Sequence, residues 1–200
     1  MSEISSLCVY CGSAPGTDPA FLEAASALGR AMALERIRLV YGGGNIGLMG
    51  TVARAVLDNG GQVTGIIPEF LKTRERMLTD VHDLVVVPDM HTRKRIMFER
   101  ADAFVALPGG VGTLEELVEQ LTWSQLGRHC KPILIADIGG FWRPFLALVD
   151  HMRDQGFVRP GFDVTYLVTD RIRDVIPMLR EAARRQPADQ AASAFIEERF

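Results

Sequence analysis

The sequence predicts a single α/β domain in which helices cover both faces of a parallel sheet. Short apolar runs rich in β-branched residues alternate with longer amphipathic segments, which is the pattern of repeated strand–helix units. The strand-like runs read as continuously apolar rather than alternating, as expected for strands buried on both faces. With 200 residues, 48% of them apolar, the chain is long enough to bury the core of one such domain.

The elements follow in order along the chain. Asp18-Pro19, for example, combines an N-cap with a first-turn proline and marks the start of the first helix. We expect strands near residues 5–10, 37–41, 62–67, 83–87, 102–107, 132–136 and 164–168. We expect helices near residues 18–35, 47–59, 90–101, 113–126, 141–154 and 170–185. The domain therefore spans residues 1–185, and residues 186–200, where the periodicity is lost, form a C-terminal tail that is either loose or packed on a partner.

Composition and charge narrow the class of protein. The net charge is −3 and no basic block occurs, so nucleic acid is not an expected partner. No apolar run has transmembrane length, and the first residues lack the basic start and apolar core of a signal peptide. We therefore expect a cytoplasmic protein that does not bind membranes.

The three cysteines do not form a recognisable framework. Cys8 and Cys11 make a C-x-x-C, but no second pair or spaced histidines complete a zinc site. Cys8 lies inside a predicted strand, whereas a redox C-x-x-C begins a helix. We expect structural thiols here, and neither a metal nor a cofactor.

Four polar or glycine-rich turns follow predicted strands. They are Cys11-Gly12-Ser13, Gly42 to Asn45, Pro68-Glu69 and Pro108 to Thr113. The carboxyl ends of parallel strands share one edge of the sheet, and ligands of such folds bind beyond that edge. The sequence thus predicts a ligand site formed where these turns converge.

The turn Pro108 to Glu116 is the most specific of the four. A strand, a glycine turn and a helix in that order direct backbone N–H groups and a positive helix end at one small volume, which suits a phosphate. Glu116 then adds a carboxylate opposite the apolar stripe of the helix. Alternatively, Thr113-Leu114-Glu115-Glu116 is a capping box, in which Glu116 bonds back to the Thr113 N–H.

A second segment of the sequence, which carries Arg93 and Lys94, favours a chemical role for Glu116. The helix that begins near Asp89 must start at the same sheet edge, and Arg93 and Lys94 flank its inward side. Arg93 is therefore expected to approach something negative near the loop: Glu116, a ligand phosphate, or both. The alternative is an arginine that caps loop carbonyls or extends to solvent. His91 could act as a base, although a histidine near a helix start is more often structural.

Gly42, Gly44 and Gly47 satisfy G-x-G-x-x-G between a strand and a helix. A dinucleotide site also needs an acid at the end of the next strand, and the first acid there is Glu69, which follows a proline. The glycines fit better a close approach of the backbone to a mononucleotide or to the neighbouring loop, or simply a tight turn. A P-loop is excluded because Gly-Lys-Ser/Thr does not occur.

With these segments together, the chain resembles the Lonely-guy (LOG) family of cytokinin-activating phosphoribohydrolases, long labelled lysine decarboxylases. The family signature P-G-G-x-G-T-x-x-E is met by Pro108 to Glu116, and its Arg-Lys pair by Arg93-Lys94. Gly42 to Gly50 match Gly-Gly-Gly-x-x-Gly-Leu-Met-Gly, and Cys11-Gly12-Ser13 matches the family's Cys-Gly-Ser. The similarity runs from about residue 5 to 180.

The resemblance implies a Rossmann-like, doubly wound fold and a homodimer. It also implies hydrolysis of the N-glycosidic bond of N6-substituted adenosine 5′-monophosphates to a free base and ribose 5-phosphate, with AMP a second candidate substrate. Arg93 and Glu116 would be the catalytic pair. The substrate-binding residues carried over are Gly12, Ser13, Gly43, Gly44, Met90, Lys94, Gly109, Gly110, Val111, Gly112 and Thr113.

Two alternatives remain open at this point. One is a non-catalytic nucleotide or molybdenum-cofactor carrier on the same scaffold, which would not need Arg93 and Glu116. The other is a general AMP nucleosidase, which would differ only in the base pocket. A decarboxylase fits poorly, because it needs a lysine bound to pyridoxal phosphate and the chain has only Lys72, Lys94 and Lys131.

Overall fold

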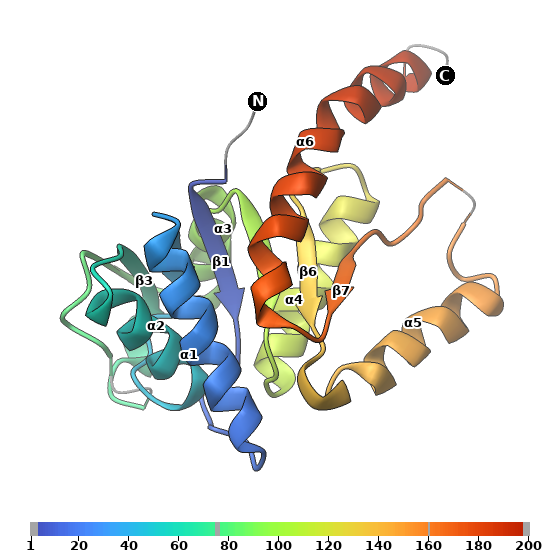
Figure 1. Ribbon diagram of the computed structural model, residues 1–200. Coiled ribbons are helices and arrows are strands. Elements are labelled where there is room, and N and C mark those ends of the chain that lie inside the picture. Colours follow the sequence, from blue (N-terminus) through green and yellow to red (C-terminus); the bar gives the residue numbers. More distant parts are fainter. Residues whose placement is uncertain (1–3, 75–76, 160, 198–200) are drawn as a thin grey trace.

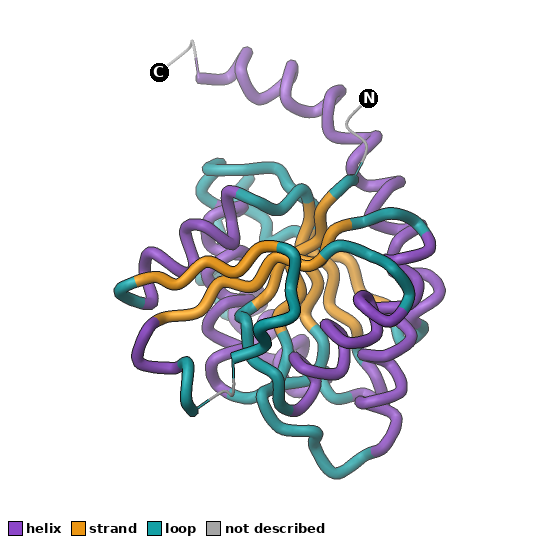
Figure 2. Tube along the Cα trace, turned by 90° about the vertical axis from the view of Figure 1, so that its left-hand side faces the viewer, coloured by secondary structure: helices purple, strands orange, loops and turns teal. Residues whose placement is uncertain are grey.

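A computed structural model describes residues 4–74, 77–159 and 161–197 of the chain. Its seven strands form one sheet in the order β4-β3-β2-β1-β5-β6-β7, and every neighbouring pair is parallel. Helices lie on both sides of this sheet (Figure 2). The predicted fold class, a doubly wound α/β domain, is confirmed.

The strands are β1 (Ser6–Tyr10), β2 (Arg38–Tyr41), β3 (Val63–Pro68), β4 (Asp83–Val87), β5 (Ala103–Ala106), β6 (Ile133–Ala136) and β7 (Leu167–Thr169). The α-helices are α1 (Pro19–Leu34), α2 (Gly47–Asp58), α3 (Met90–Glu99), α4 (Val111–Gln125), α5 (Arg143–Asp154) and α6 (Ile172–Glu197). Two short 3₁₀ turns, η1 (Glu69–Leu71) and η2 (Ile138–Gly140), complete the described elements. Each strand falls within or close to its predicted range.

The two faces of the sheet carry separate halves of the core. One cluster joins alternate strand residues such as Leu7, Val9 and Leu39 to helices α1, α2 and α6. The other joins the intervening residues such as Cys8 and Tyr10 to α3, α4 and Trp142 just before α5. Because successive strand side chains point to opposite faces, each buried strand serves both halves.

Most helix boundaries lie within two residues of the prediction, and the differences at α4 and α6 have consequences. Helix α4 begins at Val111 rather than near Thr113. Helix α6 continues to Glu197, well past Arg185, and its last turns project beyond the sheet layers (Figure 1). The extension contains several alanines, and alanine is the strongest helix former, so backbone propensity continues the helix where apolar periodicity has ended.

The helices of the structure can be compared with the length and apolar character of a membrane-spanning helix. Among the described residues, no helix combines the length and the apolar character that crossing a bilayer would require.

Candidate active site

The site lies where the winding of the chain reverses. Strand β1 pairs with β2 on one side and with β5 on the other, so the loops after β1 and β5 diverge to opposite faces and leave a crevice between them. The Gly12 N–H donates to the Pro108 carbonyl at 3.0 Å and holds these two loops together. A cavity of about 270 Å³ opens here, at the carboxyl edge of the sheet.

The N-terminus of α4 faces this cavity without a cap. Gly110 is the N-cap residue, and as a glycine it supplies no side-chain cap to the first-turn N–H groups of Val111, Gly112 and Thr113. In contrast, Asp18 caps α1 and Asp89 caps α3. The first N–H groups of a helix have no partner within the helix, so those of α4 are directed at whatever occupies the cavity.

The early start of α4 also decides the capping-box alternative. Thr113 is the third residue of the helix, with helical neighbours on both sides, and is not the N-cap that a capping box requires. The Leu114 N–H already donates to the Gly110 carbonyl at 3.1 Å. Thr113 therefore does not occupy the N-cap position that the capping-box interpretation gave it.

The glycines of this turn differ in what they do. A Cβ atom on Gly109 would collide with the Thr113 side chain, so Gly109 allows the loop to pack against α4. A Cβ on Gly110 or on Gly112 would meet no protein atom within 4 Å. These two residues instead leave open space at the cavity, as a close approach of ligand to backbone requires.

Arg93 is buried at the other side of the cavity, with 5% of the residue exposed. Its Nε donates to the Ile66 carbonyl at 3.2 Å and its Nη2 to the Gly42 carbonyl at 3.1 Å, at the ends of β3 and β2. Gly42 is required for this, because a Cβ there would collide with Nη2. Arg93 thus does cap loop carbonyls, as the alternative held, and it also lines the cavity together with Glu116.

Glu116 is 9% exposed on the sheet-facing side of α4. Burial raises the pKa of the Cys8 thiol, and the nearby negative charge of Glu116 raises it further. The pKa of Tyr10 is raised by burial and then by Cys8 and Glu116. Since such effects require proximity, the Glu116 carboxylate lies close to β1 and lines the cavity there.

The second glycine-rich turn, residues 42–47, supports the site from outside it. The Leu48 and Met49 N–H groups at the start of α2 both donate to the Gly12 carbonyl, at 3.0 and 3.3 Å. Gly47 has φ +58°, and a Cβ there would collide with Ser13. The α2 terminus therefore holds the neighbouring loop, which agrees with the loop-packing interpretation and disfavours a dinucleotide phosphate at this helix.

Most of the predicted site residues meet at the cavity. Its lining includes Gly12, Ser13, Met90, Arg93, Gly110, Val111, Gly112, Thr113 and Glu116. It does not include Gly43, Gly44, Lys94 or Gly109. The lining also contains Cys11, Met49 and Glu115, which were not predicted as site residues although each lies within one of the quoted motifs.

The other candidates differ in their relation to the cavity. His91 is exposed and, like Cys8, does not line the cavity, whereas Cys11 does. Cys8 and Cys11 belong to core clusters on opposite faces of the sheet, and all three cysteines are free thiols. Among the described residues, no group of three or more metal-binding side chains gathers.

Sequence comparison places the chain among named proteins. A family model described as "Possible lysine decarboxylase" matches residues 49–179. A cytokinin riboside 5′-monophosphate phosphoribohydrolase of Rhodococcoides fascians is 45% identical over 176 residues, covering 88% of this chain and 89% of that protein. An Arabidopsis thaliana protein of the same name is 46% identical, covering 90% of this chain and 83% of that one.

Structural comparison finds similar folds at low identity. The Moco carrier protein of Chlamydomonas reinhardtii matches with a TM-score of 0.67 and 18% identity, over 92% of this chain and 99% of that one. The molybdenum cofactor binding protein of Rippkaea orientalis matches with a TM-score of 0.65 and 20% identity, over 90% of this chain and 98% of that one. At such identities the likeness shows the fold alone.

Proposed function

The chain belongs to the Lonely-guy (LOG) family of cytokinin riboside 5′-monophosphate phosphoribohydrolases, and on that basis we propose that it hydrolyses N6-substituted adenosine 5′-monophosphates. The products are the free base and ribose 5-phosphate. The observation that carries the proposal is the single cavity that combines the uncapped α4 N-terminus with Arg93 and Glu116. A phosphate anchor and a buried carboxylate within one small volume suit cleavage of a ribosyl bond.

In the proposed mechanism, the first-turn N–H groups of α4 hold the 5′-phosphate. This anchor fixes the ribose, so binding energy remote from C1′ aligns the reacting bond. At 270 Å³ the cavity is smaller than a typical pocket for a whole drug-sized ligand, about 300–1,000 Å³, and fits the phosphoribose end of the nucleotide. The base then lies toward the mouth of the cavity.

Glu116 acts at C1′. As the C1′–N bond breaks, its electron pair moves to the base and positive charge grows on the ribose ring, as in glycoside hydrolysis. The carboxylate stabilises that charge and orients the incoming water, whose oxygen bonds to C1′. One proton of the water ends on the base nitrogen and the other remains in the new hydroxyl group. Arg93, fixed by Gly42 and Ile66, positions the phosphoribose beside Glu116.

Decarboxylation with pyridoxal phosphate is not supported by the placement of the lysines. The Lys72 ammonium pairs with Glu69 at 3.0 Å, and the Lys131 ammonium donates to the Phe98 carbonyl at 2.7 Å. Lys94 pairs with two glutamates of α4. All three lysines are described, and none of them lines the cavity.

We further propose that the protein is a cytoplasmic homodimer. Helices α4 and α5 cover the same face of the sheet and expose apolar side chains, among them Val111 at 83%, Val118 at 41% and Leu148 at 48%. Large exposed side chains of this kind are characteristic of interaction surfaces, and a second copy is the commonest partner. Three free thiols suit a reducing compartment.

A release assay tests the catalytic proposal. The protein is incubated with isopentenyl-AMP and with AMP, and free base is separated by chromatography. We expect faster release from isopentenyl-AMP, and a loss of about 100-fold or more in kcat for Glu116→Gln with ribose 5-phosphate binding retained. Release from neither nucleotide would favour a carrier, and faster release from AMP would favour a general nucleosidase. An active Glu116→Gln variant would remove Glu116 from the mechanism.

A further inference from the structure

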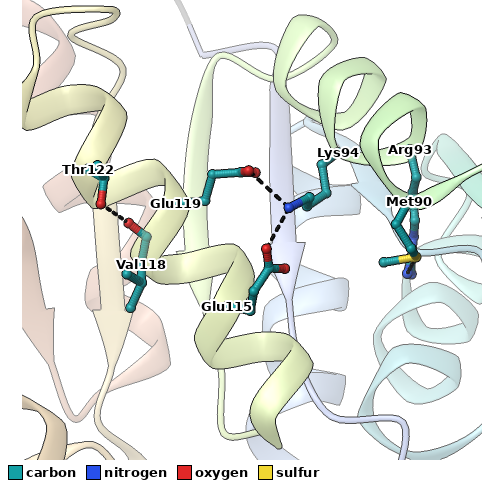
Figure 3. Close-up of polar contacts among 7 residues, drawn as sticks. All are labelled: Met90, Arg93, Lys94, Glu115, Val118, Glu119 and Thr122. Carbon is teal, nitrogen blue, oxygen red and sulfur yellow. Dashed lines mark hydrogen bonds and ion pairs between the residues drawn. The ribbon is translucent and has the colours of Figure 1, made fainter.

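Lys94 makes a bridge between two helices beside the site. Its ammonium lies 2.5 Å from Oε1 of Glu115 and 2.9 Å from Oε1 of Glu119, one turn apart on α4 (Figure 3). Only 11% of the Lys94 side chain is exposed, compared with 61% for Arg95, the next residue of α3. The Lys94 ammonium is therefore largely enclosed between the helices, with Glu119 at 21% exposure on its more buried side and Glu115 at 51% on its more open side.

Arg93 and Lys94 hold the first turn of α3 in two directions. Arg93 bonds to the carbonyls of Gly42 and Ile66 and so ties α3 to the strand ends. Lys94 reaches the other way, toward α4, as Figure 3 shows. Met90 and Arg93 of α3 line the cavity, as do Glu115 and Glu116 of α4. The bridge thus spans the two helices whose separation sets the spacing of Arg93 and Glu116.

The charges of the bridge leave Lys94 unsuited to bind phosphate. Partial burial on its own would lower the pKa of the Lys94 ammonium, but the hydrogen bonds to Glu115 and Glu119 outweigh it and raise the pKa. The ammonium therefore stays charged and is shared by two carboxylates, so the trio carries a net negative charge. Glu115 lines the cavity, and its pairing with Lys94 reduces the repulsion that its charge would exert on a phosphate.

We propose that Lys94 is a positioning residue for the hydrolysis, which fixes α3 against α4, and that it is not a ligand of the substrate phosphate. The inference rests on the proposed function for its kinetic consequence. A shift of the helices on the order of 1 Å would misplace Arg93 relative to Glu116, and misplacement of that size can lower a rate by about 100-fold.

The test compares Lys94→Met with Arg95→Met. The control removes a cation from the same helix, where Arg95 pairs with Glu99 of α3 at 3.0 Å and with no other carboxylate of the described residues. For Lys94→Met we expect a loss of about tenfold or more in kcat, while the Kd of ribose 5-phosphate, measured by calorimetry, stays within about threefold because the α4 amides remain. Lys94→Arg, which can still bridge two carboxylates, should recover most of kcat. Arg95→Met should leave both values unchanged.

Glu119→Gln provides a milder variant if Lys94→Met folds poorly, because it weakens one half of the bridge and Glu119 does not line the cavity. It should shift kcat in the same direction by less. A Kd for ribose 5-phosphate at least tenfold weaker in Lys94→Met, with kcat retained, would overturn the proposal and make Lys94 a phosphate ligand.

Hydrogen exchange separates this proposal from the proposed function. Amide exchange in residues 90–99 should be faster in Lys94→Met than in Arg95→Met, whether or not the protein releases base. If the wild type releases no base while this difference is seen, the proposed function fails and the bridge stands. If exchange is equal in the two variants, the bridge does not hold α3 and the inference fails.

Discussion

Replacing Gly112 by alanine should make the protein more stable and less active. Gly112 is the second residue of α4, and a Cβ atom there would meet no protein atom within 4 Å. Alanine is favoured over glycine within helices by about 0.5–1 kcal/mol. In a domain of this size 1 kcal/mol changes Tm by about 2–4 °C, so we expect Gly112→Ala to raise Tm by about 1–4 °C.

The effect on activity should have the opposite sign. The added methyl group would occupy the open space at the cavity, where we place the phosphate against the α4 amides. Displacing the phosphate from those donors should lower kcat/KM by at least about tenfold, equivalent to about 1.4 kcal/mol of transition-state binding. Thermal melts and the base-release assay measure the two effects on the same sample.

Gly109→Ala is the matched control. It adds the same methyl group to the same turn, but there the methyl collides with the Thr113 side chain, so Tm should fall. The reasoning is refuted if Gly112→Ala has a raised Tm and wild-type kcat/KM. In that case the α4 N-terminus does not hold the phosphate.

Two further predictions concern Asp102 and the three cysteines. Partial burial would raise the pKa of Asp102, but hydrogen bonds from residues 5–6 at 2.8–2.9 Å outweigh it and lower the pKa. A lowered pKa stabilises the fold above the pKa of the unfolded chain, and this is lost as pH falls through the folded pKa. Asp102→Asn should therefore lower Tm at pH 7, with the deficit shrinking in melts toward pH 3; a deficit independent of pH would contradict this. Separately, Cys130 is exposed, whereas Cys8 and Cys11 are buried and burial raises the pKa of Cys8. Ellman's reagent should thus label one thiol per native chain and three after denaturation, and rapid labelling of two would be evidence against the buried placement.

The sequence predicted the sheet well because its signals are local. Each strand is a short apolar run, and the alternation with helices is enough to indicate a parallel sheet. The order of the strands is not local, since it depends on which side of β1 each crossover returns to. The start of α4 was misplaced for a related reason. Thr113 and Glu116 have the spacing of a capping box, but the preceding Gly110 adopts the N-cap conformation without any side-chain signal.

The sequence predicted where the candidate site lies, but it did not predict which side chains contact one another there. Turns that follow parallel strands must share an edge, so their convergence could be inferred from order alone. The partners of Lys94 could not, because Glu115 and Glu119 are 21 and 25 residues away and meet it only through the packing of α3 on α4. Gly43 and Gly44 lie outside the cavity lining, and this too depends on tertiary packing that the sequence motif does not show.

The two glycine-rich turns look alike in sequence, yet hydrogen bonding gives them different tasks. The N–H groups of Leu48 and Met49 donate to the Gly12 carbonyl, and the Gly12 N–H donates to the Pro108 carbonyl. This relay joins the turns after β2, β1 and β5 across the crevice, and it occupies the positive end of α2 with a protein acceptor. The positive end of α4, whose N-cap residue Gly110 supplies no side-chain cap, faces the cavity next to Arg93 and Glu116. The glycine-rich turn after β2 therefore supports the neighbouring loop, and the one after β5 is where we propose that the phosphate binds.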